Sequence, residues 1–239
     1  RITSLPNFTS KQANNIDKED RKKKLYLYNM LKVVPSFSTP EQHWEYFDSI
    51  YLGKCGNIHS NIPLHLLAGV REIYLDSCVS VRSVEALGNV PKLILSSLEQ
   101  LKSIEGLGGP QQQHVVIANC PLVEDFSSLQ SIKKVEIFSC RHFKSISCVK
   151  NVQVLKLKML PGLTSLVEFR GSEQLQSISL AMCNNVVSLS GLERVGVVEV
   201  ADCNQLSDVS SLGKNGSQRL SLYGCGKVER VSHLSGLKE

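Results

Sequence analysis

The chain has 239 residues, of which 42% are apolar and 21% are charged, and its net charge is +5. This composition is typical of a globular protein, and no apolar run approaches the roughly 20 residues that span a bilayer, so no membrane span is expected. The densest basic run, at 21–24, follows acidic residues. We interpret that run as a solvated mixed-charge loop rather than a phosphate-binding patch, and we expect no nucleic-acid partner.

In chain order, the first predicted segment is a polar insertion or irregular loop at residues 6–24. From residue 25 on, an apolar-x-apolar hexapeptide that usually ends in Cys recurs at intervals of 20 to 25 residues. The hexapeptides occupy residues 25–30, 50–55, 73–78, 93–98, 115–120, 135–140, 155–160, 178–183, 198–203 and 220–225. Such periodicity marks a repeat architecture, so we predict one array of about ten rungs over residues 1–239. Because the chain begins with Arg1, and 234–237 resembles the start of another rung, we expect the array to extend past both ends.

The same frame continues after each hexapeptide. Cys78, for example, is followed at three-residue steps by Val81, Val84 and Leu87. Alternating apolar residues in the hexapeptide predict a short strand with one buried face, and the three-residue spacing favours a 3-10 or irregular return arc. A single coil of this size cannot bury its own apolar face, so neighbouring coils must stack and form a parallel sheet.

The pattern Leu-x-Leu-x-x-Cys/Asn, with its short period, resembles the leucine-rich repeat family, and in particular the internalin and phosphatase-1-regulator classes. The segment 203–212, Cys-Asn-Gln-Leu-Ser-Asp-Val-Ser-Ser-Leu, carries the resemblance most clearly. The resemblance covers nearly the whole chain and implies an α/β solenoid, a horseshoe with one parallel sheet on its concave face and short 3-10 or irregular convex arcs. It implies little about function, because function depends on sites rather than on the fold.

Seven of the eight cysteines occupy one repeat position, where the other rungs carry Met or Leu. Exchange with those residues predicts a column of reduced thiols in the core. A disulfide, of which Cys140–Cys148 is the best candidate, and a metal site are the less favoured alternatives. In relatives the same position is often Asn, whose amide binds the turn backbone. Since a thiol is a weak donor, we expect the turns here to satisfy their own backbone groups.

No catalytic, cofactor-binding or metal-ligating residues are predicted. The six histidines share no repeat column and no metal-ligand spacing, and His114, just before a predicted strand, is expected to face solvent. The glycines at 106–109 lack the Gly-Lys-Ser/Thr end of a phosphate-binding loop, so we interpret them as a turn with a short insertion that includes the following glutamines. We therefore predict that this chain is not an enzyme.

The repeat frame also predicts which strand residues face outward. Five of the six tyrosines fall in two outward columns, and Tyr suits protein interfaces because it combines a large apolar body with a polar tip. The alternative is that cross-strand tyrosine stacking only stabilises the sheet. The predicted partner-binding residues are Tyr26, Tyr28, Tyr51, Tyr74, Ile94 and Val116, with a second, basic and apolar patch at Phe138, Lys156, Lys158 and Met159.

These features predict a non-catalytic module that binds a protein or peptide of unknown identity on its concave face. Two alternatives stay open. The module could be the substrate-recognition arm of a larger ligase, cyclase or kinase, or an extracellular adhesion or recognition domain. Free buried thiols favour a cytoplasmic location, whereas the glycosylation sequons at Asn7 and Asn215 would suit a secreted protein.

Overall fold

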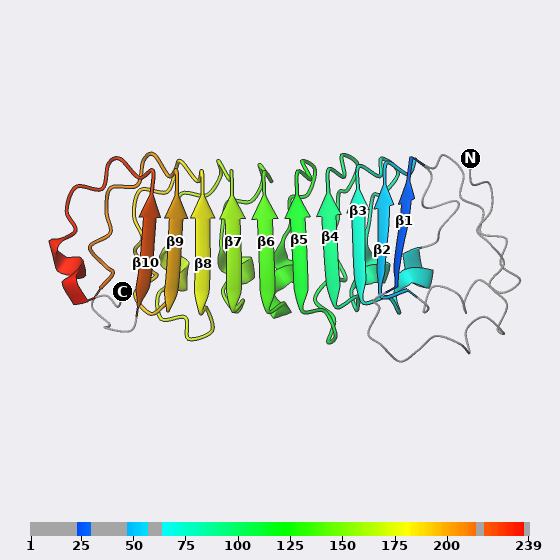
Figure 1. Ribbon diagram of the computed structural model, residues 1–239, viewed down its shortest axis with the longest axis horizontal. Helices are drawn as coiled ribbons and strands as arrows, with labels where there is room; N and C mark the ends of the chain where they lie inside the picture. The colour runs from blue at the N-terminus through cyan, green and yellow to red at the C-terminus, as the bar shows by residue number, and fades with distance from the viewer. Residues whose placement is uncertain (1–22, 30–46, 57–63, 214–217, 237–239) are drawn as a thin grey trace, which may run out of the picture.

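Ten short β-strands lie side by side in one parallel sheet, in the order in which they occur in the sequence (Figure 1). The computed structural model describes residues 23–29, 47–56, 64–213 and 218–236. The strands are β1 (Lys24–Tyr28), β2 (Ser49–Gly53), β3 (Glu72–Asp76), β4 (Lys92–Ser96), β5 (His114–Ala118), β6 (Lys134–Phe138), β7 (Val154–Lys158), β8 (Ser177–Ala181), β9 (Val197–Ala201) and β10 (Arg219–Tyr223). Equivalent positions pair at every step, as Ile73 of β3 does with Leu93 of β4.

Short 3-10 turns lie on the far side of the sheet (Figure 1). Five of them stand between two consecutive strands, and the last follows β10. They are η4 (Leu64–Leu67), η5 (Glu85–Leu87), η6 (Ser127–Ser131), η7 (Ser147–Val149), η8 (Val167–Phe169) and η9 (Ser232–Gly236). The predicted solenoid, with one parallel sheet and 3-10 arcs, is confirmed. One boundary was wrong: Lys24, assigned to the polar segment 6–24, is the first residue of β1, and residues 6–22 of that segment lie outside the described residues.

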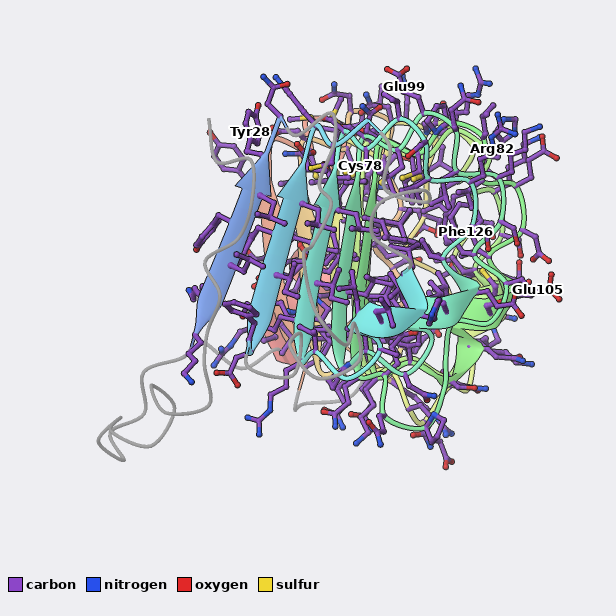
Figure 2. All side chains as sticks on the ribbon, turned by 90° about the vertical axis from the view of Figure 1, so that its right-hand side faces the viewer. Tyr28, Cys78, Arg82, Glu99, Glu105 and Phe126 are labelled. Atoms are coloured by element: carbon purple, nitrogen blue, oxygen red, sulfur yellow. The ribbon has the colours of Figure 1, made fainter. Side chains whose placement is uncertain are left out.

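The core lies between the sheet and the arcs. The two apolar residues of an inner strand, such as Ile73 and Leu75, are fully buried, and so are the arc residues three positions apart. The rings of Phe126 and Phe143 meet edge to face at 5.1 Å between centroids. Figure 2 shows Phe126 on the arc side of the sheet and Tyr28 on its outer side. The two faces of the sheet therefore have separate roles, since only the outer one is open to a partner.

The residue directly after each strand turns the chain into its arc. Its φ lies between 51° and 55° at nine non-glycine positions in the described chain, and it is 65° at Gly224. The left-handed conformation costs about 1–2 kcal/mol for an L-residue. At each of the nine positions the N–H donates to the last carbonyl of the next strand, as Ser77 does to Ser96 at 2.9 Å. This hydrogen bond extends the sheet by one position and offsets part of the cost.

The residue after each of these left-handed positions belongs, in seven rungs, to the cysteine column, and six of its seven members are buried. The Cys78 thiol lies 3.3 Å from the Asp76 carbonyl of its own rung and 3.3 Å from the Leu52 carbonyl of the preceding rung. Cys183 contacts the equivalent carbonyl pair at 3.6 and 3.7 Å. The single thiol proton can serve one of these carbonyls at a time. The Asp76 and Ala181 carbonyls already accept the Lys54 and Met159 N–H groups, so the turns satisfy their own backbone groups, as expected, and the thiols add only weak contacts.

All eight cysteines are free in the structure, including Cys140 and Cys148. Cys148 lies off the column, half-buried, with its thiol 3.5 Å from the Ser145 carbonyl. Burial raises the pKa of Cys120 to about 12 and that of Cys203 to about 11. These thiols therefore stay protonated at neutral pH, as buried apolar side chains with a weak donor would.

Two of the longer rungs hold a buried glutamine where the chain approaches the next strand. Gln112 donates to the Leu87 carbonyl at 3.1 Å and accepts from the Gly108 N–H at 2.8 Å. Gln218 likewise accepts from one backbone N–H and donates to two carbonyls. The predicted turn at 106–109 is confirmed. Gln112, interpreted as part of a short insertion, is 3% exposed and links the Gly108 N–H to the Leu87 carbonyl of the preceding rung.

Candidate functional site

The outer side of the sheet, here called the sheet face, carries the predicted tyrosines on its first three strands. Tyr26 and Tyr51 stack with ring centroids 4.3 Å apart and planes 15° apart. Tyr51 and Tyr74 stack at 4.0 Å and 13°. The register of β1, β2 and β3 aligns the three rings, so they form one continuous stack. Stacking of aromatic rings on adjacent strands stabilises the pairing of those strands.

A hollow of about 400 Å³, here called the tyrosine groove, lies beside this stack. It is lined by Tyr26, Leu27, Tyr28, Tyr51, Leu52, Gly53, Tyr74, Leu75, Asp76, Ile94 and Ser96. Gly53 opens it: a Cβ on this residue would lie 2.5 Å from Cδ2 of Tyr28, so the ring can lie close to the β2 backbone only because the side chain is absent. The Lys54 ammonium lies over the Tyr28 ring, 5.5 Å from its centroid, in a cation–π contact.

Polar contacts fix the inner end of the tyrosine stack. The Lys92 ammonium donates to the Tyr74 hydroxyl at 3.0 Å and lies 3.6 Å from the Glu72 carboxylate. The Tyr74 hydroxyl also donates to Glu72 at 3.4 Å. A hydrogen bond with Tyr74, together with burial, raises the pKa of Tyr51 above its usual value, so its hydroxyl stays protonated. The stack is therefore held in place before any partner arrives, which reduces the entropy lost on binding.

The centre of the sheet face is organised around one carboxylate. Glu136 lies 2.9 Å from the Lys134 ammonium, 3.1 Å from Nε2 of His114 and 3.9 Å from the Lys156 ammonium. Burial would raise the pKa of Glu136, but the hydrogen bond from Lys134 and the surrounding positive charges outweigh it, and the pKa is lowered. Burial and the charge of Lys134 also lower the pKa of His114, although Glu136 acts in the opposite direction.

Acidification is expected to destabilise the fold in two stages. Because the pKa of His114 is lower in the folded chain, the unfolded chain binds more protons as the pH falls below about 7, and stability decreases. The contribution of Glu136 is lost later, below about pH 4.5, as the pH falls through its lowered pKa. We expect His114→Asn to flatten the decline between pH 7 and pH 5, measured by urea unfolding. His65→Asn, at an exposed position, is the control, and an unchanged slope in His114→Asn would contradict the assignment.

The remaining predicted site residues differ in exposure. Ile94 and Phe138 are partly exposed, and Lys156 and Lys158 are exposed. Val116 lies in the predicted outward column, between Ile94 and Glu136, but only 9% of it is exposed. Val116 therefore offers little surface to a partner, and its part in binding stays a prediction.

The tyrosine groove brings together four of the five tyrosines in the two predicted outward columns. Tyr223 is 73% exposed on β10, at the other end of the sheet, and Tyr46 lies outside the described residues. The missed participants are Gly53, Glu72 and Lys92 at the groove and Glu136 at the centre. The position before the first apolar residue of each strand would have indicated Glu72 and Lys92, and Glu136 lies in the same outward column as Ile94 and Val116. His114 is the first residue of β5 and is half-buried against Glu136 rather than facing solvent.

Among the described residues there is no group of three His, Cys, Asp or Glu side chains that could hold a metal ion. In the same part of the chain, no helix has both the length and the apolar character needed to cross a bilayer. No protein-family model matches the sequence, and no curated protein matches it either.

One matching solved structure is an internalin from Listeria monocytogenes, with 12% sequence identity and a TM-score of 0.46, covering 81% of this chain and 67% of that one. At this identity no residue's role can be transferred from it. The site is accordingly defined by the chain's own geometry: a repeat solenoid with a preformed aromatic groove and a charged centre on its open sheet face.

Proposed function

We propose that this chain is a non-catalytic repeat module that binds a protein or peptide on its sheet face. The observation that carries the proposal is the tyrosine groove, an apolar hollow whose wall is a rigid stack of three tyrosines. Tyr26 and Tyr28 remain 63% and 60% exposed. Exposed aromatic side chains held in one conformation are typical anchors of protein interfaces, because they bury much area and lose little rotational freedom.

Replacing both Tyr51 and Tyr74 with alanine is expected to weaken binding of a captured partner by about tenfold or more, since truncating buried aromatic anchors typically costs over 1 kcal/mol. The partner is first isolated by affinity capture with the wild-type chain, and its affinity is then measured by calorimetry for both forms. The buried core does not include these rings, so the circular dichroism spectrum should not change.

Tyr223→Ala is the control, because this tyrosine lies on the same face but on β10, where it is 73% exposed and takes no part in the stack. Its partner affinity should equal that of the wild type. Equal affinity in the double variant as well would argue against the groove as the binding surface.

We also propose a cytoplasmic location, supported by the column of buried, protonated thiols, because such thiols persist in reducing compartments. Protein isolated from its natural source should then show all eight thiols reactive once it is denatured in the absence of reductant. A count of six or fewer would indicate a disulfide and favour an exported protein instead.

A further inference from the structure

Positive charge is concentrated on the sheet face at β6 and β7. These two strands carry three outward lysines, Lys134, Lys156 and Lys158, and a single carboxylate, Glu136. Glu136 lies within ion-pair distance of the first two. Lys158 is exposed, and among the described residues no carboxylate lies within ion-pair distance of it. The patch therefore keeps about two positive charges that the chain itself does not neutralise.

The two outward columns that join the tyrosine groove to this lysine patch carry no long side chain on β4 and β5. Ile94 and Val116 continue the column of the tyrosine stack, and Ser96 and Ala118 continue the column beside it. All four side chains are short or largely covered. From β3 to β7 there are four strand spacings of about 4.8 Å, or roughly 19 Å, which about six residues of an extended chain would cross. An extended segment could thus lie across the strands and reach both features.

We infer that the sheet face binds an acidic peptide segment, with one aromatic or large aliphatic side chain in the tyrosine groove and carboxylates on Lys156 and Lys158. This inference rests on the proposed function and names the chemistry of its partner. Beside the groove, the carboxylates of Asp76 and Glu72 balance the charges of Lys54 and Lys92, whereas the excess positive charge lies three to four strands away. This distribution of charge predicts that the apolar end of the segment lies at the tyrosine groove and its acidic end at the lysine patch.

The same surface fits a single-stranded nucleic acid less well. Bases bind such proteins by stacking on open aromatic faces. Here the faces of Tyr51 are covered on both sides, by Tyr26 at 4.3 Å and by Tyr74 at 4.0 Å. The carboxylates at Glu72, Asp76 and Glu136 interrupt the path that a phosphate backbone would follow across the strands, so charge and ring geometry both favour a peptide.

The test is selection from a phage-displayed library of random peptides of about 12 residues, long enough to cross the roughly 19 Å between groove and patch. Peptides that bind the wild-type chain should carry a net negative charge and one large apolar residue. The best of them is then synthesised with a fluorescent label, and its affinity is measured by anisotropy. Lys156→Glu/Lys158→Glu should weaken binding by about tenfold or more and reduce its salt dependence. Lys102→Glu/Lys144→Glu, at exposed positions on the arcs, makes the same change in net charge and should have little effect.

The outcomes separate this inference from the proposed function. Selected peptides without an acidic excess, whose binding still depends on Tyr51 and Tyr74, would overturn the acidic partner and leave the groove as a binding surface. Peptides insensitive to both the lysine and the tyrosine variants would overturn both. The labelled peptide is also challenged with an unrelated DNA oligonucleotide of equal charge. Displacement at the same concentration would show that the patch binds polyanions in general, and would overturn the inference of a peptide partner.

Discussion

Phe143→Ala is expected to lower the free energy of unfolding by about 3–5 kcal/mol, the usual cost of deleting a buried phenyl ring together with the cavity it leaves. Phe143 is 1% exposed and packs edge to face on Phe126 in the preceding rung. Because each rung is covered only by its neighbours, the cavity removes contacts on both sides of one interface. Urea unfolding followed by circular dichroism measures the loss.

Hydrogen exchange shows which rungs are destabilised by Phe143→Ala. Backbone amides of β5, β6 and the adjoining arcs should exchange faster, while those of β9 should change little, since coupling in a solenoid passes from rung to rung. Phe138→Ala is the control, because that ring lies partly exposed on the sheet face and should cost only about 1 kcal/mol. Equal losses in the two variants would show that Phe143 does not occupy a filled core.

Gln112→Met is the second large effect, with an expected loss of about 1–3 kcal/mol. Methionine has nearly the same volume, so packing is kept, but the part-buried Gly108 N–H loses its side-chain partner and the Leu87 carbonyl keeps only the Val90 N–H. Each buried polar group left unsatisfied costs about 1–3 kcal/mol. The measurement is again the free energy of unfolding in urea.

Gln113→Met separates the hydrogen bonds from any general effect of the substitution. Gln113 is the next residue and is exposed, so its replacement should change stability by less than about 0.5 kcal/mol. A small loss at Gln112 as well would mean that water replaces the amide, and that the longer rung does not depend on its glutamine.

The repeat frame predicted the strands because the two apolar residues of each hexapeptide must face the core, and it predicted the arcs from their three-residue spacing. It also placed Tyr26, Tyr51 and Tyr74 on adjacent strands. The tyrosine groove itself could not be predicted, because it depends on a missing side chain at Gly53 that allows Tyr28 to approach the backbone. Likewise, the low exposure of Val116 depends on the lengths of its neighbours, which periodicity does not encode.

The glutamines show a second limit. A polar residue near a turn looks solvent-exposed in a sequence pattern, yet Gln112 and Gln218 are only 3% and 2% exposed. Their burial follows from where extra backbone enters the interior, and that depends on the exact path of each loop. Sequence periodicity thus predicts the regular part of the solenoid, and its exceptions require coordinates.

The ten strands pair in regular register, so equivalent side chains on the sheet face repeat about every 4.8 Å. Duplicating one rung between the tyrosine groove and the lysine patch would move the two features apart by about 4.8 Å without changing the residues of either. Deleting one rung would bring them closer by the same distance. The length of the segment that such a protein recognises could therefore change during evolution by recombination of whole repeats, while its two contact chemistries stay the same.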